Sequence, residues 1–209
     1  MRILNYDDAL SNSLLENVLK NVNTFGWSEE SVRKALLELG LPEEDLNFIV
    51  RGDLYNLVIL FNEWLNEQIQ RDFDESLFKN LKVHEKIKYL LSLKFKVMQP
   101  YKPAIIKGVH LFKNPRAFKE SFVMLAESIN QMWYKAGDRA TDFNYYTKRL
   151  MLTLVYTRVF SLWLRPSIGI DDIDPLIDQA LLSVYKLSQL KTNASNAISN
   201  IREVLLKRR

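Results

Sequence analysis

The sequence predicts an all-α protein, and three observations support that prediction. Apolar residues recur at helical spacing along almost the whole chain, and no stretch alternates apolar and polar residues as a half-buried strand does. Gly and Pro contribute only six residues each to the 209, so few residues are available for the tight turns of hairpins. Apolar residues make up 47% of the chain, which is enough to build a buried core.

Local start and stop signals divide the first third into helices. Ser28 is followed by two glutamates, a pattern typical of a helix N-cap with an acidic first turn. Gly40 ends that helix, Pro42 opens a short one, and Asp53 caps a long one. We therefore expect two helices, a tight turn, a short helix and a long helix over residues 5–70.

Two long helices are expected later in the chain. Asn114 and Pro115 are a cap followed by a first-turn proline, and Gly137 ends the helix that they open. Its buried face is predicted to hold Phe118, Phe122, Leu125, Ala126, Ile129, Met132 and Trp133. The next helix runs from about Asp142 to Leu164, with a second helix start at Asp174 and Pro175 and an amphipathic segment at the end of the chain.

The segment 150–164 is apolar on most sides, so we expect a central helix that is buried all round. Thr153, Thr157 and Ser161 recur along it every four residues and form one stripe of small polar side chains. Such a stripe facing larger residues is also compatible with a tunnel for an apolar ligand. The two interpretations, packed core helix and ligand tunnel, both remain open from the residues alone.

The charge is distributed unevenly along the chain. Residues 1–78 carry a net charge of −9, residues 79–119 carry +10 and residues 191–209 carry +4. We divide the chain into residues 1–75, residues 76–190 and a basic amphipathic tail, 191–209. The tail fits a helix lying on an anionic membrane surface, a helix docked on its own domain, or a dimerisation helix.

Several classes of protein are excluded or disfavoured. Cysteine is absent, which excludes disulfides and thiolate metal sites, and the two histidines, His84 and His110, lie on different predicted helices without the Glu spacing of a di-iron site. No nucleotide-binding loop or nucleophile motif is present, so we predict a protein that is not an enzyme and needs no cofactor or metal. The start of the chain lacks the features of a signal peptide, and Leu150–Leu164 is too short to span a bilayer, which favours a soluble cytoplasmic protein.

The order of helices over residues 5–70 resembles the N-terminal helix-turn-helix of TetR-type regulators. Its recognition helix would begin Pro42-Glu43-Glu44-Asp45, and residues 28–53 carry a net charge of −4. A recognition helix must approach phosphates, so these acids argue against DNA binding. A TetR-type ligand-sensing regulator is retained as the alternative function, and a purely structural helical adaptor that binds no lipid also remains open.

The segment Met132–Arg149, MWYKAGDRATDFNYYTKR, resembles the signature of the Coq-nine family, which are lipid-binding accessory proteins of ubiquinone biosynthesis. Supporting matches lie at Gly26–Ser28, Leu39–Leu41, Lys82–Ile87 and Gln99–Pro103. The resemblance covers roughly residues 10–165 and weakens beyond. One departure is Tyr145, where the family has Trp, so the aromatic face is retained with a smaller area.

This resemblance implies a TetR-like fold with a degenerate helix-turn-helix, a homodimer, and an apolar pocket for an isoprenoid lipid or ubiquinone intermediate in residues 76–190. It also implies a partnership with the demethoxyubiquinone hydroxylase and a peripheral location on the inner membrane of a bacterium. The predicted lipid-binding residues are Phe122, Leu125, Ile129, Trp133, Leu150, Leu154 and Thr157. The family's partner-binding patch falls on Met132, Asp142, Tyr145 and Tyr146, which we expect to be exposed.

Overall fold

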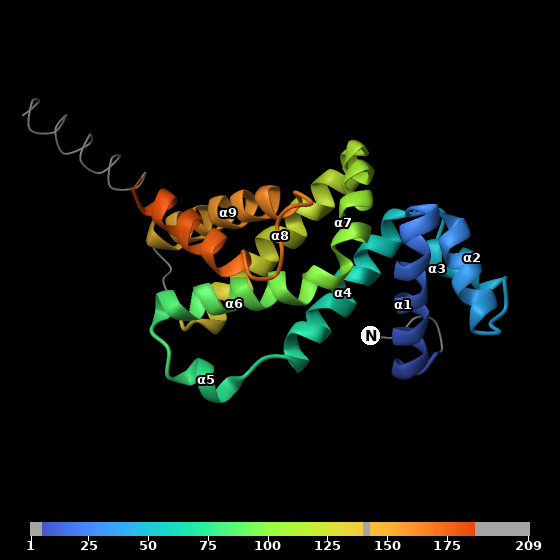
Figure 1. The fold of residues 1–209 in the computed structure, drawn as a ribbon, viewed down its shortest axis with the longest axis horizontal. Helices are drawn as coiled ribbons and strands as arrows, with labels where there is room; N and C mark the ends of the chain where they lie inside the picture. Colours follow the sequence, from blue (N-terminus) through green and yellow to red (C-terminus); the bar gives the residue numbers. More distant parts are fainter. Residues whose placement is uncertain (1–5, 140–142, 187–209) are drawn as a thin grey trace, which may run out of the picture. The chain divides into compact units, whose positions relative to one another are not determined.

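The computed structural model describes residues 6–139 and 143–186, and over these residues the all-α prediction is confirmed, because they form helices and turns and no strand (Figure 1). The helices are α1 (Asp8–Phe25), α2 (Glu29–Glu38), α3 (Asp45–Val50), α4 (Tyr55–Arg71), α5 (Glu75–Lys79), α6 (Val83–Met98), α7 (Lys102–Gly108), α8 (Pro115–Lys135) and α9 (Phe143–Trp163). Short 3-10 turns, Gln99–Tyr101 and Val109–Lys113, flank α7, and residues 173–186 are also helical. The basic tail, 191–209, lies outside the described residues.

The chain separates into two compact units, Met1–Met132 and Trp133–Arg209. The first unit contains α1 to α7 and most of α8, and the second contains the end of α8, α9 and the helical residues 173–186. The position near residue 75, where we divided the sequence, lies inside the first unit. No helix among the described residues is both long enough and apolar enough to cross a bilayer.

Capping residues fix most of the helix starts that the sequence predicts. The Ser28 hydroxyl accepts a hydrogen bond from the amide of Ser31 at 3.4 Å, and the Asp53 carboxylate accepts one from the amide of Tyr55 at 2.9 Å. Asn114 accepts from the amide of Arg116 at 2.9 Å and thereby starts α8. The helix start predicted at Pro42 was wrong by three residues, because α3 begins at Asp45. The carbonyl of Pro42 accepts a hydrogen bond from the amide of Asp45 in the turn before the helix.

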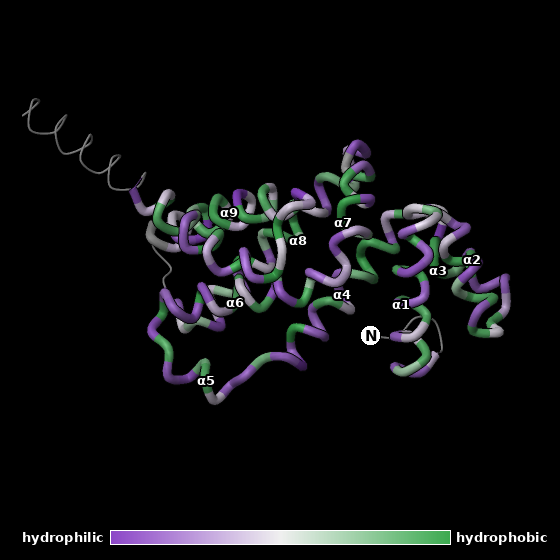
Figure 2. The backbone as a smooth tube through the Cα atoms, viewed as in Figure 1, coloured by the Kyte–Doolittle hydropathy of each residue, from purple (hydrophilic) through white to green (hydrophobic). Residues whose placement is uncertain are grey.

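An aromatic cluster fills the core of the first unit. Trp64, only 1% exposed, packs edge-on against Tyr101 at 5.0 Å between ring centroids, and Phe61 lies 6.0 Å from both Tyr101 and Trp27. The Trp27 indole N–H donates to the carbonyl of Ala104 at 2.8 Å. Figure 2 shows hydrophobic and hydrophilic residues interleaved along the helices, as expected for helices with one apolar and one polar face.

Two hydroxyl groups on α8 bind side chains of the first unit. The Tyr55 hydroxyl lies 2.9 Å from the Ser121 hydroxyl, and the Lys94 ammonium donates to the Ser128 hydroxyl at 2.8 Å. Ala117, 1% exposed, continues the same face one turn earlier. The predicted burial of Phe118 and Phe122 was therefore wrong: these rings lie beside the inward face and are 62% and 59% exposed.

Helix α9 is buried along one stripe and exposed along another, so the prediction that it is buried all round was also wrong. Leu152, Val155, Val159 and Trp163 are at most 2% exposed, whereas Leu150 and Leu154 are 62% and 43% exposed. The polar stripe is satisfied within the helix itself: the Thr153 and Thr157 hydroxyls donate to carbonyls one turn back, at 2.9 Å each.

We expect the burial of Lys94 to make stability depend on pH. The side chain is 6% exposed, and burial lowers the pKa of its ammonium group to about 8. The unfolded chain keeps this proton up to about pH 10.4. Between these two values the unfolded state binds more protons than the folded state, so stability rises with pH.

The free energy of unfolding, measured in urea at pH 7 to pH 10.5, should therefore rise by up to about 3 kcal/mol more in the wild-type chain than in Lys94→Met. Lys94→Met keeps a linear side chain at the site but has no charge to desolvate. A difference between the two proteins that stays constant over this pH range would contradict the prediction.

Candidate functional site

Five residues of the Met132–Arg149 signature come together beside the turn after α8, within the second unit: Trp133, Asp138, Tyr145, Lys148 and Arg149. Gly137 has φ +94°, a backbone conformation that L side chains rarely adopt, and this ends α8. The amide of Gly137 donates to the carbonyl of Tyr134 and the amide of Asp138 to that of Trp133, both at 3.0 Å. These bonds close the last turn of α8 and place Asp138 directly after it.

The carboxylate of Asp138 is the electrostatic centre of this turn. Asp138 as a whole residue is half-buried, and its side chain alone is only 5% exposed. Lys148 lies 2.6 Å from one carboxylate oxygen and Arg149 lies 3.3 Å from the other. Both cations come from α9, so this ion cluster fixes the first turns of α9 against the turn that precedes it.

Each of the two cations also contacts an aromatic ring. The Lys148 ammonium lies 5.6 Å from the Trp133 ring centroid, and the Trp133 indole N–H donates to the carbonyl of Lys148 at 3.2 Å. The Arg149 guanidinium carbon lies 3.3 Å from the Tyr145 ring centroid, and Arg149 also donates to the Tyr145 carbonyl at 3.1 Å. We call Trp133, Asp138, Tyr145, Lys148 and Arg149 the Asp138 cluster.

The predicted partner-binding residues differ in their exposure. Tyr146 is 71% exposed, as expected, and packs edge-on against Tyr145 at 5.1 Å between centroids. Tyr145 is half-buried instead of exposed, since Arg149 covers its ring. Met132 is only 7% exposed, which corrects its place in an exposed patch. Asp142 lies outside the described residues.

The structure adds residues that our prediction omitted. Tyr134, 78% exposed, is the most exposed large aromatic side chain beside the turn. Asp138, Lys148 and Arg149 were missed as site residues, although all three belong to the signature segment. The signal that was available in the sequence is an acid, Asp138, directly after the predicted end of the first long helix, followed ten residues later by two consecutive bases.

The predicted lipid-binding residues fall on α8 and α9. On α8, Ile129 is 1% exposed, Leu125 is half-buried and Phe122 is exposed. On α9, Leu150, Leu154 and Thr157 are exposed and follow one another at helical spacing, while Trp133 belongs to the Asp138 cluster. In the first unit, a separate open cleft of about 270 Å³ is lined by Gln68, Asp72, Leu93, Lys96, Val97, Pro100 and Tyr101, none of them a predicted lipid residue.

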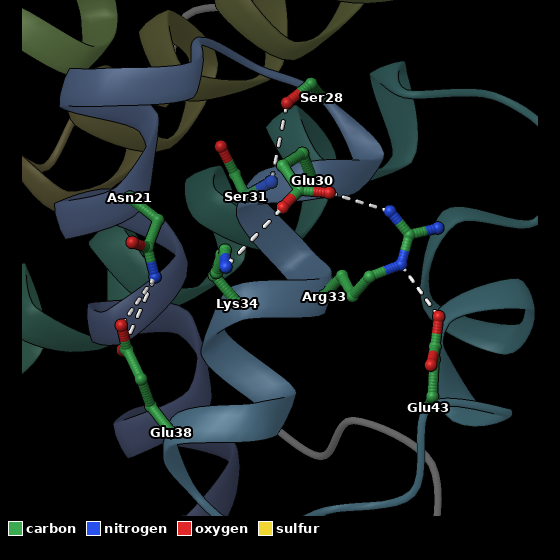
Figure 3. Close-up of polar contacts among 8 residues, drawn as sticks. All are labelled: Asn21, Ser28, Glu30, Ser31, Arg33, Lys34, Glu38 and Glu43. Atoms are coloured by element: carbon green, nitrogen blue, oxygen red, sulfur yellow. Dashed lines mark hydrogen bonds and ion pairs between the residues drawn. The ribbon is translucent and has the colours of Figure 1, made fainter.

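In the helix-turn-helix region of the first unit, both bases of α2 pair with carboxylates (Figure 3). Arg33 on α2 bonds two of them, Glu43 at 2.7 Å and Glu30 at 2.8 Å, and Lys34 lies 3.9 Å from Glu30. Asn21 of α1 donates to Glu38 at 3.4 Å. The bases on α2 are therefore directed at neighbouring acids. Within residues 6–139 and 143–186, no three His, Asp or Glu side chains cluster as a metal ion would require.

The different exposures of Tyr145 and Tyr146 lead to a stability prediction. Tyr145→Ala removes a half-buried ring stacked on Arg149, so it should lower the free energy of unfolding by about 1–2 kcal/mol. Tyr146→Ala removes an exposed ring and should change it by no more than about 0.5 kcal/mol. Urea unfolding followed by circular dichroism measures both values. Equal losses in the two variants would contradict the assignment.

Comparison with known proteins extends the description. The COQ9 family model matches residues 118–190. The chain is 29% identical over 150 residues to the probable ubiquinone biosynthesis protein coq9, mitochondrial, of Dictyostelium discoideum, which covers 69% of this chain and 49% of that protein. It is 24% identical over 157 residues to the ubiquinone biosynthesis protein COQ9, mitochondrial, of Homo sapiens, which covers 72% of this chain and 49% of that protein. The chain thus spans about half the length of these relatives.

A solved structure with the same fold is the TetR transcriptional regulator from Nitrosomonas europaea ATCC 19718. It superposes with a TM-score of 0.69 at 13% sequence identity and covers 85% of this chain and 99% of its own. At this identity the likeness establishes the fold alone, which is all-α and TetR-like. The resemblance to the Coq-nine family indicated by the Met132–Arg149 signature is confirmed, and the chain is similar to COQ9 proteins over about seven-tenths of its length.

Proposed function

We propose that this protein acts in ubiquinone biosynthesis as a non-catalytic accessory protein. It binds an isoprenoid quinone intermediate and presents it to the demethoxyubiquinone hydroxylase. The observation that carries this proposal is the Asp138 cluster, which holds the signature residues of the family in one ordered corner with Tyr146 and Tyr134 exposed beside it. The names of the curated relatives support the pathway. This chain spans only about half of their length, so their full activities are not carried over to it.

Exposed apolar residues on α9 support lipid binding. Leu150 and Leu154 are one turn apart and remain 62% and 43% exposed, and Thr157 follows on the same face. Burying apolar surface is worth roughly 25 cal/mol per Å². A polyprenyl tail lying along such a strip would gain a few kcal/mol, enough to offset part of the cost of leaving a membrane.

Exposed aromatic residues beside the Asp138 cluster support protein docking. Aromatic residues that reach a partner from a fixed backbone concentrate binding energy, because little conformational entropy is lost on binding. Tyr146 and Tyr134 have this character, and Tyr145 is held beside them by Arg149. We infer that the hydroxylase docks on this corner.

A DNA-binding regulator is the less favoured function. The bases on α2 that approach acids, Arg33 and Lys34, are paired with Glu30 and Glu43, and α3 begins with Asp45 after Glu43 and Glu44. Carboxylates at the position of a recognition helix repel phosphates. We therefore propose that the TetR-like fold serves here without DNA binding.

We also propose a homodimer. Phe118, Phe122 and Val123 are 62%, 59% and 53% exposed on α8, and a monomer seldom leaves consecutive large apolar residues uncovered. Since Phe122 is also a predicted lipid residue, oligomeric state and lipid content should be measured on the same samples.

The lipid proposal is tested by Thr157→Phe, which adds an aromatic ring at an exposed position of the predicted lipid set. Its expected effect is a severalfold loss of the lipid that copurifies, measured by native mass spectrometry and by extraction, with helical content unchanged. Gln179→Phe, at an exposed position of the helical residues 173–186 and outside the set, is the matched control and should retain the lipid. Equal lipid content in both variants would count against the site.

The docking proposal is tested by the affinity for purified hydroxylase. Tyr145→Ala should weaken binding about thirtyfold, which corresponds to about 2 kcal/mol. Tyr145→Trp restores the residue found in the family and should bind as well as the wild-type chain or better. Tyr185→Ala, at a 57% exposed position elsewhere in the second unit, should leave the affinity unchanged. A folded Tyr145→Ala protein with normal affinity would place the interface elsewhere.

We further propose that residues 191–209 recruit the protein to anionic membranes, where the peripheral inner-membrane location would arise. Their net charge of +4 supports this, because each base near such a surface contributes about 1 kcal/mol. Deletion of residues 191–209 should abolish flotation with vesicles of phosphatidylglycerol and phosphatidylcholine. High salt should weaken flotation of the full chain. Flotation of the truncated chain at the level of the full chain would refute this role.

A further inference from the structure

The two oxygens of the Asp138 carboxylate contact two consecutive bases of α9. One oxygen lies 2.6 Å from Lys148 and the other 3.3 Å from Arg149. The side chain of Asp138 is 5% exposed, that of Arg149 16% and that of Lys148 40%. The acid is therefore too covered to meet a partner, whereas the bases lie between it and the surface.

Each base connects the carboxylate to a different aromatic residue. Lys148 reaches the Trp133 ring, and its own carbonyl accepts the Trp133 indole N–H. The Arg149 guanidinium carbon lies over the Tyr145 ring, 3.3 Å from its centroid, and Arg149 also donates to the Tyr145 carbonyl. A single carboxylate thus holds both of the cations that contact the rings of Trp133 and Tyr145.

The Arg149 guanidinium would change its orientation if the charge of the Asp138 carboxylate were removed. The buried carboxylate and the Tyr145 carbonyl together fix the plane of the Arg149 guanidinium, since its N–H donors have a rigid fork geometry. Removing the negative charge leaves two adjacent bases that repel each other and are only partly covered. They then turn toward water, and the Tyr145 ring loses its cover.

We infer that Asp138 is a positioning residue for the aromatic docking corner. It holds Lys148 and Arg149, and through them Trp133 and Tyr145, in the orientation that a partner meets. The docking part of this inference rests on the proposed function, whereas the positioning part concerns the chain alone.

The positioning part is tested with Asp138→Asn, which keeps the shape of the side chain and removes its charge. The indole N–H resonance of Trp133 in a ¹⁵N spectrum, assigned with Trp133→Phe, reports the bond to the Lys148 carbonyl. We expect this resonance to shift in Asp138→Asn and in Lys148→Met, with the indole resonance of the fully buried Trp163 unmoved. Asp171→Asn, at an exposed acid of the same unit, should shift neither. An unmoved Trp133 resonance in both cluster variants would overturn the inference.

The docking part is tested with a double-mutant cycle against purified hydroxylase. Asp138→Asn should weaken binding about tenfold, and the double variant with Tyr145→Ala should lose less affinity than the product of the two single losses, because the acid acts partly through that ring. Losses that multiply would show that Asp138 does not act through Tyr145 and would overturn this part.

The two failures are distinguishable. Normal hydroxylase affinity of Tyr145→Ala refutes the proposed docking function, and the Trp133 resonance still decides whether Asp138 positions the corner. Should Asp138→Asn not fold, Lys148→Met and Arg149→Gln carry both measurements, since each removes one of the two connections at a partly exposed position.

Discussion

Hydrogen bonds that join Tyr55 to Ser121 and Lys94 to Ser128 decide which face of α8 is covered and which is left for other molecules. Tyr55 and Lys94 reach these two hydroxyls from α4 and α6, and small residues are the ones that allow such close approach. Ala117, Ser121 and Ser128 turn inward, while Phe118 and Phe122 remain exposed beside them. The cost is a buried ammonium group at Lys94, whose charge is desolvated.

The second unit is organised by the opposite device, a buried carboxylate that gathers two cations. Breaking a buried ion pair costs more than the pair contributes, so such a cluster specifies one arrangement of its side chains more than it stabilises the fold. At the turn after Gly137 that arrangement determines where two aromatic residues point. An ordered aromatic surface loses little entropy when a partner binds, which connects the cluster to the proposed docking function.

The helix-turn-helix region separates fold from function. The fold matches that of a TetR regulator, whereas the charges in the helix-turn-helix region have the sign that phosphates repel. Packing depends on the buried residues of α1, α2 and α4, and DNA binding depends on the exposed residues of α2 and α3. The first set can be retained while the second changes freely. A shared fold at 13% identity therefore carries no function with it.

The sequence by itself determined the helical class, most helix boundaries and the family resemblance. These depend on local chemistry: Ser28, Asp53 and Asn114 accept hydrogen bonds from amides two or three residues ahead, and Gly137 supplies a positive φ. The signature segment is equally local, because its residues are consecutive. Helical periodicity predicts that a helix has an apolar face, but only the tertiary structure decided what lies opposite that face. This is why Phe118 and Phe122 proved exposed and Tyr145 covered by Arg149, a base that is four residues away and held in place by the distant Asp138.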